Sequence, residues 1–173
     1  MDNSIRKIAI VGPESTGKTT LAKQLAEKYE TKWVPEYARE YLEALDRNYV
    51  KDDLLVIARG QLQSETQYET SARELLICDT NLVVIKVWSE YKYGSLDKWI
   101  EHQLENRSYD LYLLTNCDIP WEEDVLRENP ENREYLFKQY EAFLKESQLP
   151  YVVIEGSEEE ERLAMAIKNI NNL

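Results

Sequence analysis

The sequence is poor in cysteine and histidine, and it contains no long apolar run. No stretch approaches the ~18 apolar residues that a membrane-spanning helix needs. The short polar N-terminus lacks the apolar core of a signal peptide, so we expect a cytoplasmic protein. Cys78 and Cys117 each end an apolar run without CxxC spacing, which favours two buried thiols over a disulfide or a metal site. The single histidine, His102, lies in a polar stretch with helical character, and we expect it at the surface.

Basic residues are also scarce. The chain has 21 Lys and Arg against 33 Asp and Glu, which gives a formal net charge of −12. Proteins that bind nucleic acid normally carry a basic stripe that displaces counterions from phosphates. We therefore expect a small-molecule partner, with neither nucleic acid nor membrane as the main partner. The sequence leaves the oligomeric state open.

Short apolar runs alternate with amphipathic segments over the 173 residues, a length typical of about one domain. Strands are expected at 5–11, 33–34, 75–78, 111–115 and 151–154, and helices at 18–29, 38–45, 54–72, 82–93, 131–146 and 162–170. Gly60 is expected to interrupt or weaken the third helix, and the acidic run 158–161 to open the last one. The alternation predicts an α/β fold with a mainly parallel five-stranded sheet and helices on both faces. We expect a single domain, 1–173, with its site at the carboxyl ends of the strands.

The clearest motif is a phosphate-binding loop between the first strand and the first helix. Residues 12–19, GPESTGKT, match G-x-x-x-x-G-K-[ST] at every fixed position. Gly12 and Gly17 let the backbone curl so that its N–H groups point at phosphate oxygens, and the following helix adds the positive end of its dipole. Lys18 supplies a cation for the β- and γ-phosphates. The expected nucleotide contacts are Gly12, Glu14, Ser15, Thr16, Gly17, Lys18, Thr19 and Thr20, with ATP as the cofactor.

A magnesium-binding carboxylate is expected at Asp79, directly after the apolar run 75–78. This is the pattern of a Walker B site, where the carboxylate holds Mg²⁺ directly or through water, together with the Thr19 hydroxyl. A capping role for Asp79 at the next helix is the alternative interpretation, and the two roles are compatible.

Three classes of P-loop protein compete for this sequence. A GTPase would need a lysine where Asn116 stands in the segment 115–118, and no switch-type glycine is evident. A regulatory ATPase usually carries extra domains or an oligomerising lid, for which 173 residues leave little room. A small-molecule kinase needs a carboxylate near the second strand and a mobile lid that carries arginine. The segment 35–40, PEYARE, and the polar segment 119–133, which contains Arg127 and Arg133, are candidates for these parts.

Over nearly its whole length, and in the same order, the chain resembles a known kinase domain. The segments that carry the resemblance are GPESTGKTTLAKQLA, PEYAREY, ICDTN and PWEEDVLR. They are similar to the ribosylnicotinamide kinase domain of the bifunctional NAD-salvage proteins, a P-loop kinase of the AAA-domain ATPase and kinase group. That resemblance implies ATP-dependent phosphorylation of nicotinamide riboside to nicotinamide mononucleotide. The chain departs from the family at Asn81, where members tend to have an Asp, and this bears on the identity of the substrate. A regulatory ATPase and a nucleoside kinase of other specificity stay open as alternatives.

Together, the motifs and the resemblance suggest roles for single residues. Lys18, Glu36, Asp79 and Arg127 are the expected catalytic residues. Glu36 would orient or deprotonate the 5′-hydroxyl of a ribose, unless it pairs with Arg39 one helical turn on. Arg127 would stabilise charge on the transferring phosphoryl group, unless it is a solvated surface arginine. The expected substrate-binding residues are Glu36, Tyr37, Arg39, Trp88, Tyr91, Trp121 and Asp124, with the aromatic rings facing a planar and possibly cationic ring.

Overall fold

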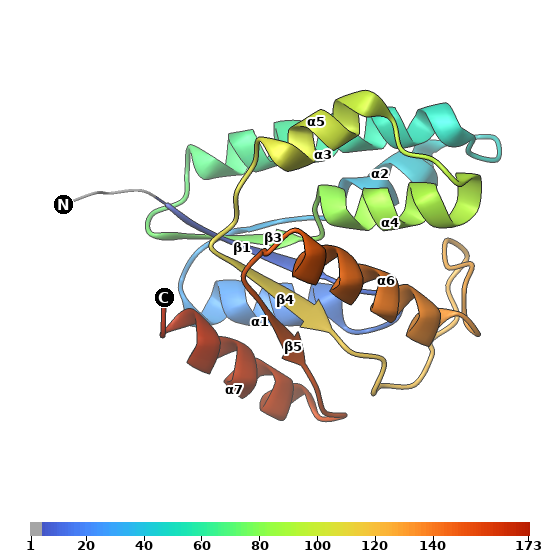
Figure 1. The fold of residues 1–173 in the computed structure, drawn as a ribbon. Helices are drawn as coiled ribbons and strands as arrows, with labels where there is room; N and C mark the ends of the chain where they lie inside the picture. Colours follow the sequence, from blue (N-terminus) through green and yellow to red (C-terminus); the bar gives the residue numbers. More distant parts are fainter. Residues whose placement is uncertain (1–4) are drawn as a thin grey trace.

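The computed structural model describes residues 5–173 and contains a five-stranded parallel sheet (Figure 1). The strands are β1 (Arg6–Val11), β2 (Trp33–Val34), β3 (Leu75–Asp79), β4 (Leu111–Thr115) and β5 (Tyr151–Ile154). They lie in the order β2-β3-β1-β4-β5, and every neighbouring pair is parallel. The order places β1 at the centre, so the loop that follows it lies in the middle of the carboxyl edge.

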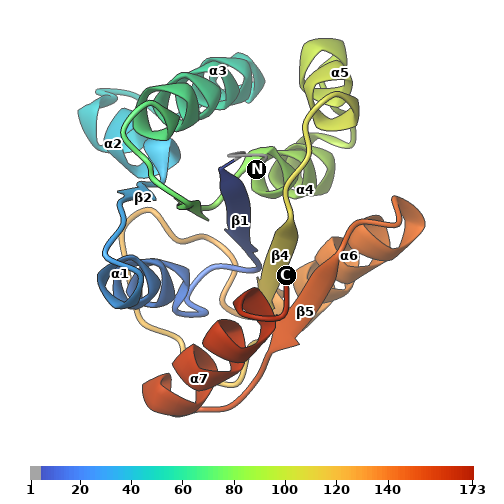
Figure 2. The same cartoon turned by 90° about the vertical axis from the view of Figure 1, so that its left-hand side faces the viewer.

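Helices connect the strands and cover both faces of the sheet. They are α1 (Lys18–Lys28), α2 (Tyr37–Ala44), α3 (Lys51–Glu69), α4 (Leu82–Tyr93), α5 (Lys98–Glu105), α6 (Arg133–Glu146) and α7 (Glu159–Ile170). Figure 2 shows α1 and α7 on one side of the sheet and α4 and α6 on the other. The predicted fold class, a parallel sheet between two layers of helices, is confirmed.

The central strand shows why the sheet needs two layers. Ile8 and Ile10 pack in the core formed with α1 and α7. Ala9 and Val11 pack in the core formed with α4 and α6. All four side chains are fully buried, because successive side chains of a strand point to opposite faces and both faces are covered.

Two helices differ from the sequence-based expectation. α3 runs without interruption through Gly60 and begins at Lys51, three residues earlier than predicted, where the Asp53 carboxylate accepts the Val50 backbone N–H at 2.7 Å. Gly60 therefore does not interrupt the helix, and its missing side chain makes room for the ring of Tyr37. α5 was foreseen only as a helical tendency around His102. It begins after Asp97, whose carboxylate caps the backbone N–H of Trp99 at 2.8 Å.

The two cysteines are free in this structure, as predicted. Cys78 is fully buried in β3, but Cys117 is only half-buried, so the expectation of two buried thiols is wrong for the second residue. Cys117 lies just beyond the end of β4, where the chain leaves the sheet. Within residues 5–173, no helix is long and apolar enough to cross a membrane.

Candidate active site

The phosphate loop joins β1 to α1 at the carboxyl edge of the sheet and lies tightly against β4. A Cβ added to Gly12, which has φ 144°, would lie 2.5 Å from Thr115 Oγ1 and 2.8 Å from its carbonyl oxygen. Gly17 has φ 76° and precedes the first residue of α1. The buried Thr16 hydroxyl donates to the Pro13 carbonyl at 2.7 Å and lies 2.7 Å from Thr115 Oγ1. These contacts hold the curl of the loop backbone in place. The Thr16 side chain binds the loop to β4, so only its backbone N–H is available for a phosphate.

The Lys18 ammonium lies inside the curl of this loop. It donates to the carbonyls of Gly12 at 3.0 Å and Pro13 at 2.6 Å. Burial lowers the pKa of Lys18, whereas the negative charges of Glu36 and Asp79 oppose that decrease. Anionic phosphates in the loop would add negative charge next to Lys18 and would further stabilise its charged form.

Thr19 and Asp79 meet beside the loop, in an arrangement suited to Mg²⁺. The Thr19 hydroxyl donates to Asp79 Oδ2 at 2.6 Å. The other carboxylate oxygen, Asp79 Oδ1, is buried and has no hydrogen-bond partner among residues 5–173. Burial raises the pKa of Asp79, while the Thr19 hydrogen bond and Lys18 lower it. Mg²⁺ is commonly held by one or two carboxylates plus substrate phosphates, so this donor pair fits the ion.

The alternative role of Asp79, capping α4, falls to a neighbour. Asn81 is the N-cap residue of α4, and its side-chain oxygen accepts the Val83 backbone N–H at 2.9 Å. Asp79 is therefore left to face Thr19 and the phosphate loop.

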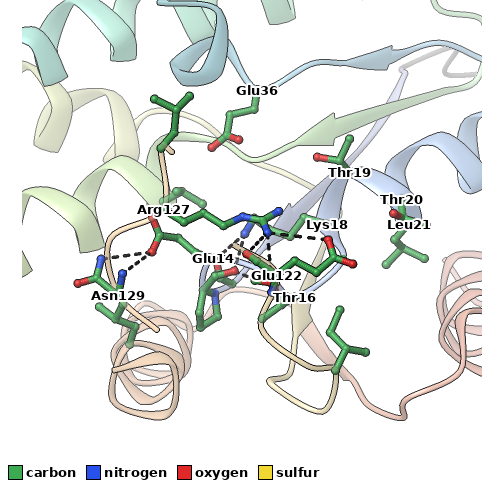
Figure 3. Close-up of a pocket in the computed structure, with 18 of the residues that line it drawn as sticks. Glu14, Thr16, Lys18, Thr19, Thr20, Leu21, Glu36, Glu122, Arg127 and Asn129 are labelled. Carbon is green, nitrogen blue, oxygen red and sulfur yellow. Dashed lines mark hydrogen bonds and ion pairs between the residues drawn. The ribbon is translucent and has the colours of Figure 1, made fainter. Parts of the chain in front are cut away.

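Glu36 precedes α2 and does not cap it. The N-cap position belongs to Glu36, but its side chain makes no capping hydrogen bond. The first backbone N–H of the helix, that of Tyr37, instead donates to Gln61 Oε1 of α3 at 2.9 Å. Burial raises the pKa of Glu36, and the nearby Lys18 ammonium opposes that rise. The Glu36 carboxylate lines the cavity together with Lys18, and Figure 3 shows both side chains in that cavity.

One continuous cavity of about 460 Å³ connects the phosphate loop to Glu36. Its walls fall into two parts. Near the start of α7, the phosphate loop is joined by Gln24, Ser157, Glu159 and Arg162. On the Glu36 side, the wall is mainly apolar and aromatic, with Leu42, Val84, Val87, Trp88, Tyr91, Leu126, Leu136 and Tyr140. The cavity can therefore hold a nucleotide at one end and a second, partly apolar molecule at the other.

The segment 116–132 between β4 and α6 contains no strand or helix and closes over the phosphate loop. We call residues 119–133 the lid. The Glu14 carboxylate accepts the backbone N–H of Asn129 at 3.0 Å and that of Glu128 at 3.2 Å. The Ser15 hydroxyl accepts the Glu122 N–H at 2.9 Å. Glu14 and Ser15, expected from sequence as nucleotide contacts, thus use their side chains to hold the lid.

Both lid arginines bind the phosphate loop. Arg127 donates to the Glu122 carbonyl at 2.6 Å and lies 3.4 Å from Ser15 Oγ, and it lines the cavity (Figure 3). Arg133 donates to the carbonyls of Ser15 at 2.9 Å and Ile119 at 3.0 Å. The Arg127 guanidinium therefore lies beside the phosphate loop in the cavity wall, whereas Arg133 holds the base of the lid through two backbone carbonyls.

The predicted substrate-binding residues separate into two groups. Arg39, Trp88 and Tyr91 line the cavity together with Glu36. The remaining predicted residues, Tyr37, Trp121 and Asp124, lie outside its lining.

The three residues outside the lining have other contacts. The Tyr37 ring lies against Gly60, the Trp121 ring faces the Arg133 guanidinium at 5.8 Å, and Asp124 accepts from Arg39 at 2.9 Å. Arg39 therefore pairs with Asp124 and not with Glu36, the partner that the alternative interpretation assigned to it.

Tyr140 and Arg162 are among the residues of the cavity wall that were not foreseen from the sequence. Tyr140 of α6 is 4% exposed and lines the cavity, and its hydroxyl forms no hydrogen bond with residues 5–173. Burial raises the pKa of Tyr140, as do the carboxylates of Glu36 and Glu14. Arg162 of α7 donates to the carbonyls of Thr16 at 2.6 Å and Gly156 at 3.0 Å. The available signal was helical spacing: Leu136 and Tyr140 are four residues apart and share one face of α6.

Comparison with known proteins agrees with this geometry. A family model described as an AAA domain matches residues 7–162. Two curated relatives are trifunctional NAD biosynthesis/regulator proteins, NadR, from Salmonella typhimurium (strain LT2) at 22% identity and from Escherichia coli (strain K12) at 24%. Each alignment includes 98% of this chain but only 43% of the relative, so the chain spans less than half the length of these proteins.

Solved structures show the same fold. A NadR protein in complex with NAD and AMP-PNP matches with TM-score 0.77 and 26% identity, over 97% of this chain and 49% of that one. A NadR protein in complex with NR matches with TM-score 0.74 and 25% identity, over 97% and 51%. Thymidylate kinase from Ehrlichia chaffeensis matches with TM-score 0.71 over 96% and 99%, and its 15% identity shows the fold alone.

Proposed function

We propose that this chain, which belongs to the AAA-domain family matched over residues 7–162, is an ATP- and Mg²⁺-dependent small-molecule kinase. Its acceptor, in this proposal, is the 5′-hydroxyl of nicotinamide riboside, and its product is nicotinamide mononucleotide. The single observation that carries the proposal is one cavity that joins Lys18 of the phosphate loop to the Glu36 carboxylate, which has no hydrogen-bond or ion-pair partner within residues 5–173. We also propose that residues 1–173 form one kinase domain with its lid at 119–133.

The phosphate loop and the lid would bind the nucleotide from two sides. Backbone N–H groups of the loop and the start of α1 surround the β- and γ-phosphates, and Lys18 adds positive charge. Mg²⁺ held by Thr19 and Asp79 would supply further charge that neutralises the phosphate oxygens. Arg127 reaches the transferring group from the lid, which also excludes water that would otherwise hydrolyse ATP.

Glu36 would act on the acceptor. Its carboxylate orients the 5′-hydroxyl and accepts the proton as the hydroxyl oxygen bonds to the γ-phosphorus. The bond from the γ-phosphorus to the bridging oxygen breaks at the same time, and ADP leaves with that oxygen. Burial, which raises the pKa of Glu36, makes the carboxylate a better proton acceptor than an exposed glutamate.

Three observations support nicotinamide riboside over other acceptors. A similar solved structure holds NR, which we take to be nicotinamide riboside, and the relatives are described as NAD biosynthesis proteins. The acceptor end of the cavity also carries the rings of Trp88 and Tyr91, and aromatic faces attract a cationic pyridinium. The cytoplasmic location expected from the sequence stays a prediction.

A coupled assay for ADP release tests the proposal directly. Purified protein is incubated with ATP, Mg²⁺ and, separately, nicotinamide riboside, thymidine, deoxyadenosine or no acceptor. We expect ADP release and nicotinamide mononucleotide only with nicotinamide riboside. Turnover with thymidine or deoxyadenosine instead would assign a nucleoside kinase of other specificity, and equal ADP release without an acceptor would assign an ATPase.

A further inference from the structure

A cluster of four side chains joins the lid to the acceptor wall of the cavity. At its centre is Tyr49, in the loop between α2 and α3, which does not line the cavity itself. The Trp88 indole N–H donates to the Tyr49 hydroxyl at 3.0 Å, and the two rings meet edge to face with centroids 5.0 Å apart. The same hydroxyl donates to Glu128 Oε2 of the lid at 2.6 Å.

Lys92 completes the cluster from the last turn of α4. Its ammonium donates to the Tyr49 hydroxyl, pairs with Glu128 at 3.1 Å, and lies 4.0 Å from the centre of the Tyr49 ring. The hydroxyl of Tyr49 therefore accepts two hydrogen bonds and donates one, which is its full capacity. These bonds place the Tyr49 hydroxyl between Trp88 and Glu128, while Lys92 and Glu128 themselves stay exposed to solvent.

Glu128 is the junction between this cluster and the phosphate loop. Its backbone N–H donates to the Glu14 carboxylate of the loop at 3.2 Å, while its side chain binds Tyr49 and Lys92. The preceding residue, Arg127, reaches over the phosphate loop. Two consecutive lid residues thus contact the nucleotide side and the acceptor side of the cavity.

We propose that Tyr49 is a positioning residue that ties closure of the lid to the orientation of Trp88 in the acceptor wall. When the lid lies on the phosphate loop, Glu128 can accept the Tyr49 hydroxyl, and that hydroxyl then fixes the Trp88 indole. An open lid removes the acceptor of the hydroxyl and leaves the indole ring free to turn. Nucleotide binding, which holds the lid closed, would thereby complete the acceptor site. This inference rests on the proposed kinase function for its kinetic test and on nucleotide binding alone for its spectroscopic test.

The kinetic test removes only the hydroxyl, with the variant Tyr49→Phe. In this variant the Trp88 indole loses its hydrogen bond to the Tyr49 hydroxyl. We therefore expect the KM for nicotinamide riboside to rise roughly tenfold. The values of kcat and of the KM for ATP should change less than about twofold. The matched control is Tyr29→Phe, which removes a tyrosine hydroxyl bonded to Asn171 at 2.8 Å, between α1 and the end of the chain. The control should leave all three constants unchanged. An unchanged acceptor KM in Tyr49→Phe would refute the inference.

A double-mutant cycle tests whether the lid acts through Tyr49. Glu128→Ala removes the acceptor from the lid side and keeps the backbone N–H that binds Glu14. It should raise the acceptor KM by a similar factor. Adding Tyr49→Phe to it should then change the acceptor KM by less than about twofold, because the path is already broken. Multiplicative effects of the two substitutions would contradict a shared path.

The spectroscopic test needs no acceptor. The chain has four tryptophans, and 5-fluorotryptophan labelling gives each a fluorine NMR signal, with Trp88 assigned by its loss in Trp88→Phe. We expect AMP-PNP with Mg²⁺ to shift and sharpen the Trp88 signal in the wild type, and to change it less than half as much in Tyr49→Phe. A Trp88 signal that ignores the nucleotide in the wild type, or responds equally in both proteins, would overturn the coupling. If nicotinamide riboside proves not to be a substrate, this measurement still decides the inference.

Discussion

Replacing Gly60 with alanine tests how α3 positions the catalytic end of α2. A Cβ added at Gly60 would lie 2.0 Å from Tyr37 Cε1 and 2.4 Å from both Cδ1 and Cζ. Carbon atoms in contact prefer about 3.5–4.0 Å, so the ring would have to retreat by roughly 1.5 Å. Tyr37 directly follows Glu36, and its backbone N–H is held by Gln61 of the same helix. The substitution therefore pushes on the segment that carries the proposed base.

The magnitude follows from two opposing effects. Alanine in the middle of a helix is favoured over glycine by about 0.8–1 kcal/mol. Overpacking of a well-packed contact costs about 1–3 kcal/mol. Their difference predicts that Gly60→Ala destabilises the fold by up to about 2 kcal/mol. Displacement of a catalytic group by ~1 Å can cost ~100-fold in rate, so we expect kcat to fall more than the stability change suggests.

Urea unfolding and steady-state kinetics measure the two effects. The matched background is Tyr37→Ala, in which the ring is gone and only the helix propensity remains. There, Gly60→Ala should stabilise the protein by about 1 kcal/mol, the reverse of its sign in the wild type. If Gly60→Ala has the same effect on stability in both backgrounds, the steric argument is refuted.

Four further substitutions test the site. Glu36→Gln should lower kcat by ~10²–10⁴ and abolish the acidic limb of the pH profile of kcat/KM. Because burial raises the pKa of Glu36 in the folded state, the ionised carboxylate lowers the stability of the fold once the pH exceeds the pKa of the unfolded state. The variant should therefore melt at a higher temperature than the wild type at neutral pH, and at no higher temperature near about pH 4. Arg127→Ala should lower kcat by up to ~10³ with ATP affinity by calorimetry changed less than about threefold, whereas a loss of affinity alone would mean simple binding. Asp79→Asn should raise the Mg²⁺ concentration for half-maximal activity at least ~10-fold, and unchanged Mg²⁺ dependence would remove Asp79 from the metal site. Tyr140→Phe should raise the acceptor KM about 3- to 10-fold and leave the KM for ATP unchanged, if the Tyr140 hydroxyl in the cavity wall makes one neutral hydrogen bond to the bound acceptor. Equal rises in both KM values would contradict a contact with the acceptor.

Much of the fold could be predicted because its signals are local. Each strand is a short and mainly apolar run. The uninterrupted apolar pattern from Ile8 to Val11 already requires cover on both faces of the sheet. The phosphate loop can be recognised from the sequence because Gly12 and Gly17 adopt positive φ, and their spacing is fixed by the shape of a phosphate. The residues with the strongest sequence signal are therefore those whose backbone geometry is demanded by the ligand itself.

Contacts between distant segments could not be predicted in the same way. Gly60 carries a local signal for a weak helix, and only the ring of Tyr37, 23 positions earlier, explains why glycine stands there. The sequence left a capping role open for Asp79, but in the structure Asn81 is the cap because its side-chain oxygen reaches the Val83 N–H. Tyr37 is an aromatic residue beside Glu36, which favours a contact with the substrate. Its ring packs against α3 instead and lies outside the cavity lining.

The variable positions of the phosphate loop show what this means for function. The motif leaves the residue type at positions 14 and 15 free. Because Glu14 and Ser15 lie inside the phosphate loop, the sequence alone predicts that both contact the nucleotide. In the structure their side chains accept backbone N–H groups of the lid, at 3.0 Å for Glu14 with Asn129 and 2.9 Å for Ser15 with Glu122. The fixed positions thus determine that phosphate is bound, and the variable ones determine which lid closes over it. Because the same lid carries Arg127 over the phosphate loop and binds Tyr49 through Glu128, a substitution at Glu14 or Ser15 can act on both contacts through the lid.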